Sequence, residues 1–165
     1  MKVVDALKSR VAVALLSLSL GGAGAIVAHE GLRTTAYVDP VGIVTVCAGH
    51  TKTAKLGQVK TKAECAELLR QDTKHAETAI KRLVKVKLTQ RQYDALVSFV
   101  FNVGEGNFAT STLLKRINEG RCTAASQEFL RWDKAKGKRL PGLTARREYE
   151  SAEFNTGCAI KVASS

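Results

Sequence analysis

Residues 29–51 read HEGLRTTAYVDPVGIVTVCAGHT, and this stretch decides how the chain folds and which chemistry it supports. Glu30 directly follows an apolar run, where the exclusion of water favours the protonated form of a carboxyl group. Asp39 lies nine positions further on, in a Val-Asp-Pro-Val-Gly turn whose hydration keeps a carboxylate ionised. Thr45 follows on a predicted strand, where its hydroxyl group would hold a water molecule near Asp39. Two carboxyl groups in opposite environments are what glycoside hydrolysis requires.

The residues around these three form a longer pattern without insertion or gap. Its members are Glu30, Gly31, Leu32, Arg33, Tyr37, Asp39, Gly42, Thr45, Gly49 and His50. The pattern resembles the motif of the phage-type lysozymes, the endolysins of tailed phages that form glycoside hydrolase family 24. The resemblance implies a two-lobed α+β fold, in which a long helix joins a small antiparallel β-lobe to a mainly helical C-terminal lobe. It also implies that Glu30, Asp39 and Thr45 are the catalytic residues.

The activity that the resemblance implies is hydrolysis of the β-1,4 bond between N-acetylmuramic acid and N-acetylglucosamine in peptidoglycan. In an inverting mechanism Glu30 protonates the leaving oxygen and Asp39 activates water, so their carboxyl groups should lie roughly 6.5–9.5 Å apart. Neither a cofactor nor a metal ion is implied, and the chain has no motif for either.

Two other classes of protein stay open as alternatives. A lytic transglycosylase uses no attacking water, and the pairing of Asp39 with Thr45 argues against it. A non-enzymatic, membrane-anchored cationic binding protein would leave the spacing of the three catalytic candidates unexplained.

Two further stretches resemble the walls of the family's cleft. Residues 99–114 resemble a motif of the helical lobe, and residues 131–148 resemble the last segment that faces the cleft. The positions that we expect to bind substrate are His50, Phe101, Ser111, Thr112 and Gly142. Taken from the residue types alone, Phe101 is also typical of a helical core, and His50 is also suited to orienting the β-lobe through hydrogen bonds.

The rest of the chain predicts one two-lobed domain. Residues 36–59 are rich in β-branched residues and turn formers, which indicate a small antiparallel sheet. Thr61-Lys-Ala-Glu64 and Thr89-Gln-Arg-Gln92 are capping boxes, and each precedes apolar residues spaced three and four apart, as in a helix. The first of these helices would bridge the lobes. Further helices are predicted near residues 111–119, 123–133 and 143–155.

An uncharged run over residues 11–28, VAVALLSLSLGGAGAIVA, follows Lys8 and Arg10. Basic residues before an apolar run are typical of exported proteins. As a helix the run would be about 27 Å long, just enough for a hydrocarbon core of ~30 Å. Its many Gly, Ala and Ser residues make insertion only weakly favourable. Because no polar face interrupts the run, we do not expect it to pack as a helix in a soluble core.

Three interpretations of this run compete. Ala23-Gly24-Ala25 fits a cleavable signal peptide, and the length fits a permanent anchor. The content of small residues fits best a weak anchor that resembles the signal-arrest-release segments of certain phage endolysins. We therefore expect residues 1–28 to be such a segment and residues 29–165 to be the catalytic domain. Residues 11–28 would contact the bacterial inner membrane at its periplasmic face, before release into the periplasm.

The composition points to an anionic partner. The chain has 165 residues and a formal net charge of +11, which suits binding to nucleic acid, an acidic membrane face or an anionic polymer. Its low aromatic content of 5% leaves few side chains for stacking on bases, so we expect no nucleic acid partner. The expected partner is the glycan strand of peptidoglycan, and we expect the protein to be a monomer.

Four cysteines, Cys47, Cys65, Cys122 and Cys158, match no zinc-binding spacing. Spacing alone leaves three disulfide connectivities open, and export would favour oxidation. In the fold that the resemblance implies, Cys47 lies on a strand near Cys65, which begins the next helix. Cys122 and Cys158 would begin and end the C-terminal helices. We therefore expect the pairs Cys47–Cys65 and Cys122–Cys158, neither at a catalytic position.

Overall fold

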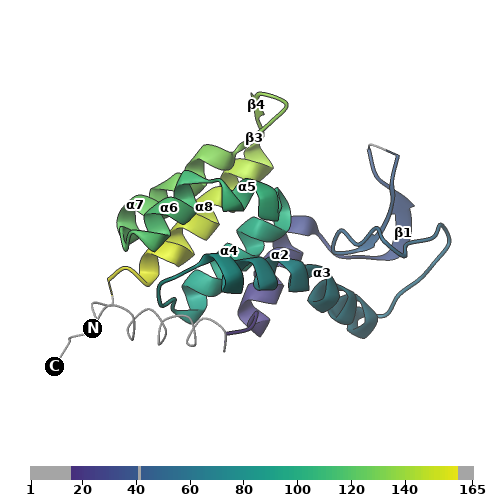
Figure 1. The fold of residues 1–165 in the computed structure, drawn as a ribbon. Helices are drawn as coiled ribbons and strands as arrows, with labels where there is room; N and C mark the ends of the chain where they lie inside the picture. Colours follow the sequence, from purple (N-terminus) through teal and green to yellow (C-terminus); the bar gives the residue numbers. More distant parts are fainter. Residues whose placement is uncertain (1–15, 41, 160–165) are drawn as a thin grey trace.

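A computed structural model describes residues 16–40 and 42–159, and it has the predicted two-lobed α+β architecture (Figure 1). The strands β1 and β2 form one lobe, and the C-terminal helices form the other. In chain order the described elements are α2 (Leu20–Glu30), β1 (Arg33–Val38), β2 (Val44–Cys47), α3 (Lys62–Leu83), α4 (Gln90–Val103), α5 (Glu105–Ala109), α6 (Thr112–Asn118), α7 (Cys122–Glu128), the 3-10 helix η1 (Phe129–Trp132), β3 (Lys134–Ala135), β4 (Lys138–Arg139) and α8 (Pro141–Thr156).

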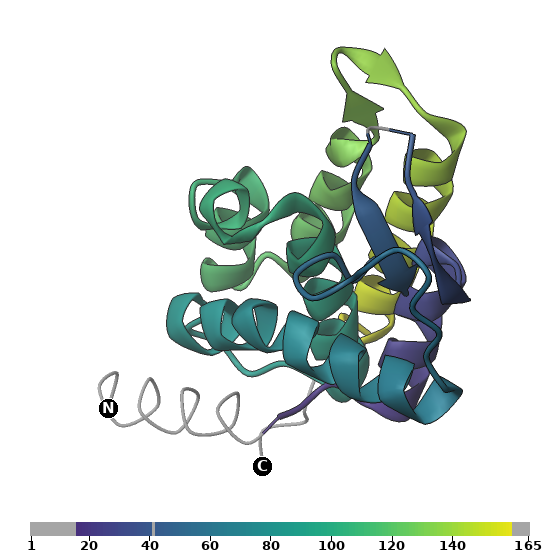
Figure 2. The same cartoon turned by 90° about the vertical axis from the view of Figure 1, so that its right-hand side faces the viewer.

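The β-lobe is an antiparallel hairpin with a small core of its own. β1 pairs with β2 so that Tyr37 lies opposite Thr45, and Thr35 forms a further bridge with Val59. Its buried apolar residues are Ala36, Val46, Cys47 and Cys65. The antiparallel sheet predicted over residues 36–59 is confirmed with shifted bounds, since β1 begins at Arg33 and β2 ends at Cys47. Figure 2 turns this hairpin toward the viewer and shows it standing above α3.

The helix α3 joins the two lobes, as predicted (Figure 1). It begins at the expected capping box, in which the Thr61 side chain accepts from the backbone N–H of Glu64 and the Glu64 side chain accepts from that of Thr61. Its buried positions recur at intervals of three and four from Cys65 to Ile80. Cys65 belongs to the core of the β-lobe, whereas Ile80 belongs to that of the helical lobe, so one helix fixes both.

The core of the helical lobe is built around α4, which packs against α2, α3 and α8. The second predicted capping box, Thr89 with Gln92, begins this helix. Tyr93, Leu96 and Phe99 are fully buried. The Phe99 ring makes edge-to-face contacts with the side chains of Phe108, Phe129 and Trp132. Edge-to-face pairs of this kind stabilise the core beyond the burial of their area.

The three C-terminal helices that we predicted all form, with shifted ends. α6 and α8 lie within one or two residues of the expected ranges, and the helix expected over 123–133 is divided into α7 and η1. The short helix α5 and the hairpin of β3 and β4 were not predicted. The turn of this hairpin places Lys136 and Gly137 at positive φ, a conformation that a sequence indicates when Asn, Asp or Gly precedes the glycine, and lysine precedes it here.

The apolar run behaves differently from our expectation. Its second half forms α2, which packs against α4 and buries Ile26 completely in the helical core. The prediction that this run is not a packed core helix is therefore wrong for residues 20–28. The proposed division after residue 28 also falls inside α2. In the ranges 16–40 and 42–159, no helix is long and apolar enough to cross a membrane. Residues 11–15 lie outside the described residues.

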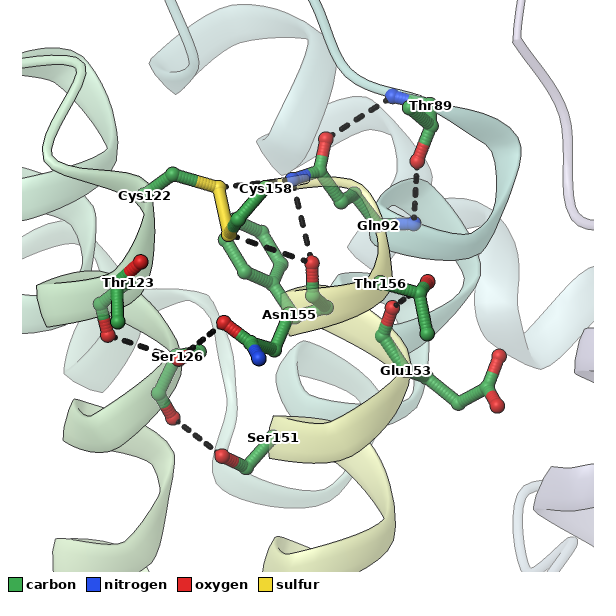
Figure 3. The surroundings of a disulfide bond; sticks show 11 residues. Thr89, Gln92, Cys122, Thr123, Ser126, Ser151, Glu153, Asn155, Thr156 and Cys158 are labelled. Carbon is green, nitrogen blue, oxygen red and sulfur yellow. Dashed lines mark hydrogen bonds between the residues drawn. A yellow bond between two sulfur atoms is a disulfide. The ribbon is translucent and has the colours of Figure 1, made fainter. Parts of the chain in front are cut away.

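Both predicted disulfides are confirmed. Cys47 pairs with Cys65 at a Cα–Cα distance of 5.1 Å and joins the β-lobe to α3. Cys122 pairs with Cys158 at a Cα–Cα distance of 5.5 Å, and this bridge joins the start of α7 to the second residue after α8. Figure 3 shows the second bridge beside Gln92, whose side-chain amide donates to the Phe154 carbonyl and contacts the Cys122 sulfur. Gln92 thus ties α4 to Cys122 and to α8.

Candidate active site

Glu30 is the last residue of α2 and lies between the helical lobe and the β-lobe. Nη1 of Arg146, on α8, donates to Glu30 Oε1 over 2.5 Å. The other oxygen, Oε2, faces Gly49 in the turn after β2. A Cβ atom on Gly49 would lie 3.5 Å from this oxygen. The Glu30 side chain keeps 24% of its surface exposed, so its carboxyl group is held by the protein and still reachable from solvent.

The position of Glu30 depends on how α2 is docked at its other end. The Ser19 side chain caps the helix by accepting from the Gly22 N–H. Ser19 in turn donates through its N–H and its hydroxyl group to the two carboxylate oxygens of Asp94 on α4, at 3.0 and 2.5 Å. A Cβ atom on Gly22 would lie 2.7 Å from Asp94 Cγ, so glycine is required for this close approach. Asp94 therefore anchors the helix that carries Glu30.

Asp39 and Thr45 are connected through the backbone of Ile43. The Ile43 N–H donates to Asp39 Oδ1 over 2.8 Å, and the Thr45 hydroxyl group donates to the Ile43 carbonyl over 3.2 Å. The Asp39 N–H donates to the same carbonyl, which closes the turn between β1 and β2. Thr45 is buried, whereas Asp39 is partly exposed. The backbone of Ile43 thus fixes both the Asp39 carboxylate and the Thr45 hydroxyl group.

A buried ionic cluster lies behind Glu30. Arg146 Nε contacts Glu150 Oε1 at 3.1 Å, and Arg147 Nε contacts Glu150 Oε2 at 2.8 Å. The Ser98 hydroxyl group donates to Glu150 Oε1 over 2.7 Å, and Ser98 also accepts from Arg146. Burial raises the pKa of Glu150, although Arg147, Ser98 and Arg146 act in the opposite direction. Burial lowers the pKa of Arg147.

His50 is buried with both ring nitrogens in contact with protein groups. Nδ1 lies 2.6 Å from Asp72 Oδ2 on α3, and Nε2 lies 2.8 Å from the Thr53 hydroxyl oxygen. The Thr53 N–H also donates to Nε2, which makes Nε2 an acceptor and leaves the proton on Nδ1 for Asp72. This arrangement ties the β-lobe to α3. A role for His50 in substrate binding stays a prediction.

The other predicted substrate-binding residues occupy different surroundings. Phe101, on α4, packs partly against the core, with its ring 6.4 Å from that of His75. Ser111 is nearly buried and caps α6 by accepting from the Leu114 N–H. Thr112 is exposed on the first turn of α6, and Gly142 is exposed on the first turn of α8. Their contact with substrate also stays a prediction.

Sequence reasoning assigned no role to Arg146, Glu150 or Asp94. Arg146 falls inside the segment that resembles a cleft wall, which is the one signal that could have indicated it. The spacing of Arg146 and Glu150, four apart on a helix, usually marks an exposed ion pair. Only the fold places this pair in the interior.

Comparisons with known proteins show the family to which the chain belongs. The phage lysozyme family model matches residues 27–150. The SAR-endolysin of bacteriophage PS119 is 44% identical over 140 residues, which cover 84% of each chain. A mutant of P22 lysozyme has a TM-score of 0.79 at 37% identity, covering 86% of this chain and 99% of its own. The muramidase domain of SpmX from Asticaccaulis excentricus has a TM-score of 0.78 at 39% identity, covering 84% and 97%.

The chain therefore belongs to the phage lysozyme family. It is a glycoside hydrolase, and within that class it is a muramidase of the endolysin type.

Proposed function

We propose that this endolysin hydrolyses the β-1,4 bond after N-acetylmuramic acid by a single displacement that inverts the anomeric centre. Glu30 donates a proton to the leaving oxygen, Asp39 removes a proton from the attacking water, and Thr45 positions that water. The observation that carries this proposal is the shared anchoring of Asp39 and Thr45 on Ile43, because a base and a water-holding hydroxyl group must be oriented together. A transglycosylase would need no such pair.

The substrate that fits the charge of this protein is peptidoglycan. Its stem peptides carry carboxylates, and a chain with net charge +11 is attracted to them. No group of three or more His, Cys, Asp or Glu side chains that could hold a metal ion occurs in residues 16–40 and 42–159.

Lysis of permeabilised Gram-negative cells, followed by turbidity, tests the role of Glu30. Glu30→Gln should lower the rate by about 10²–10⁴-fold, because an amide cannot act as a general acid. Glu119→Gln is a matched control, since Glu119 is an exposed acid at the end of α6, and it should lyse cells at the wild-type rate. Equal rates for Glu30→Gln and the wild type would refute the assignment.

The stereochemistry is tested separately by NMR of the first product released from a glycan oligomer. Inversion of a β-linked bond should release the α-anomer, and Asp39→Asn should abolish turnover. Thr45→Ser keeps a hydroxyl group and should retain part of the activity. A β-anomer as the first product would refute inversion and indicate the closer carboxyl spacing, ~5–5.5 Å, of retaining enzymes.

We also propose that residues 11–28 act as a releasable membrane anchor during export to the periplasm. Several relatives are named SAR-endolysins, including those of bacteriophage PS119 and enterobacteria phage P21. Insertion of the run into the inner membrane would hold Glu30 at the bilayer surface, away from Asp39 and Thr45, so the tethered enzyme would be inactive. Escape would let the second half of the run dock on α4 as α2.

The anchor proposal is tested by strengthening the membrane segment without disturbing the docked helix. Gly22 must stay, since it contacts Asp94, whereas no atom lies within 4 Å of a Cβ atom on Gly24 and only the Ser19 hydroxyl oxygen lies near one on Gly21. Gly21→Leu with Gly24→Leu should favour insertion, at about −0.3 to −0.6 kcal/mol per leucine, and delay lysis. Lysis on the wild-type schedule, or a mature protein that begins at Ile26, would refute release.

A further inference from the structure

The proposed acid shares its arginine with a second carboxylate that no solvent reaches. Arg146 contacts Glu30 through Nη1 and Glu150 through Nε, so one planar guanidinium group bridges the two acids. The side chain of Arg146 is 4% exposed and that of Glu150 is fully buried, whereas Glu30 keeps solvent access. Because Arg146 is in contact with Glu150, the charge on Glu150 affects the interaction between Arg146 and Glu30.

The charges in this cluster bear directly on whether Glu30 holds a proton. Arg146 and Arg147 are both positive, and both favour the ionised form of a nearby carboxyl group. Only the protonated form of Glu30 can donate to a leaving oxygen. An ionised Glu150 offsets one of the two positive charges, because it pairs with both guanidinium groups at once. A neutral Glu150 would leave both charges acting on Glu30.

The groups that face the cluster come from three helices and one turn. α8 contributes Arg146 and Arg147, and α4 contributes the hydroxyl group of Ser98 and the amide of Asn102, which accepts from Arg147. On α2, His29 lies beside Glu30, and its pKa is lowered first by burial and then by the two arginines. The turn after β2 contributes Gly49, which has no charge. The lowered pKa of His29 agrees with a positive field at this end of α2.

We propose that Glu150 is a positioning residue of the muramidase, which fixes the guanidinium group of Arg146 and offsets one positive charge so that Glu30 stays able to donate a proton. This proposal rests on the assignment of Glu30 as the acid. The buried hydrogen bond from Ser98 and the two ion pairs hold Glu150 in place for this role. Glu150 acts through Arg146 and makes no contact with substrate.

The test is the dependence of kcat/KM on pH for Glu150→Gln, which keeps the size of the side chain and its contact with Ser98. Losing the negative charge favours ionised Glu30, so the alkaline limb of the profile should move to lower pH, by about one unit for charges in this environment. Activity at pH values below the limb should fall much less than activity above it. Glu153→Gln, an acid one turn further along α8 whose contact with Arg91 is 3.9 Å, should not move the limb.

A second variant should shift the alkaline limb in the opposite direction, and it also covers the case in which Glu150→Gln fails to fold. Arg147→Gln removes one of the two cations, so its alkaline limb should move to higher pH. Circular dichroism reports whether each variant is folded. A purely structural role would lower activity equally at every pH, and an unmoved limb in a folded variant overturns the proposal.

Glu30→Gln separates this proposal from the one on which it rests. If Glu30→Gln is inactive and the limb of Glu150→Gln or Arg147→Gln is unmoved, the role of Glu150 is overturned while that of Glu30 stands. If Glu30→Gln is active, the assignment of the acid fails, and the role of Glu150 fails with it.

Discussion

The docking of α2 through Asp94 gives the sharpest prediction for stability and activity together. Asp94→Ala removes two hydrogen bonds from Ser19 and one from Gln90. Hydrogen bonds to charged groups contribute about 1.5–3 kcal/mol each. Because the two bonds from Ser19 are only partly buried, we take the low end of this range for each, and losing both should cost about 3 kcal/mol. Since 1.36 kcal/mol is a factor of ten, the population of undocked α2 should rise roughly 150-fold.

A double-mutant cycle with Ser19→Ala separates this contact from general destabilisation. Ser19→Ala should cost about 2.5 kcal/mol, namely ~1 for the helix cap and ~1.5 for the hydroxyl bond to Asp94. Because that bond is counted in both single variants, the double variant should cost about 1.5 kcal/mol less than their sum in urea unfolding.

Amide hydrogen exchange and the rate of cell lysis complete the test of this contact. Protection should fall first in α2, and lysis should slow, since Glu30 moves with the helix. Arg91→Ala, an exposed change on α4, is the control and should alter neither quantity. The docking argument is refuted if the unfolding costs of the two single variants add up to that of the double variant. It is also refuted if amide protection falls outside α2 while α2 itself stays protected.

Three further changes have defined outcomes. Gly49→Ala should lower the free energy of unfolding by about 1–2 kcal/mol, because Gly49 has a φ of +80°, and equal urea midpoints would contradict this. Replacing Cys122 and Cys158 together by serine should cost about 4 kcal/mol for the 36-residue separation, with little change in kcat/KM at 25 °C; a Tm equal to that of the wild type would argue against it. Thr61→Ala should cost about 1 kcal/mol through the loss of the α3 cap, measurable as a lower Tm.

The parts of the fold that could be predicted depend on short-range patterns. The capping boxes at Thr61 and Thr89 and the apolar spacing behind them indicate α3 and α4, because each needs only residues within a few turns. The turn around Asp39 is equally local. The disulfide pairs followed once the resemblance had placed the four cysteines on particular elements.

The parts that could not be predicted depend on distant partners. Gly22 contacts Asp94 72 positions away, and nothing in an apolar run indicates such a fit. Arg146 meets Glu30 across 116 positions and Ser98 across 48, so its burial follows from the assembled fold. For these residues the side-chain type suggests a surface role, and the tertiary structure decides otherwise.

The helix α2 carries Glu30 at one end and, in its first turn, Gly22 packed on Asp94. If residues 11–28 enter a bilayer as we propose, these positions must suit two solvents in succession. Larger apolar residues would improve the fit to lipid, yet at Gly22 they would prevent the fit to α4. Substitutions that the bilayer would tolerate are excluded by docking on α4. The range of residues found in this segment should therefore be narrower than in an ordinary anchor. The timing of lysis and the geometry of the active site would then evolve together through the same few small residues.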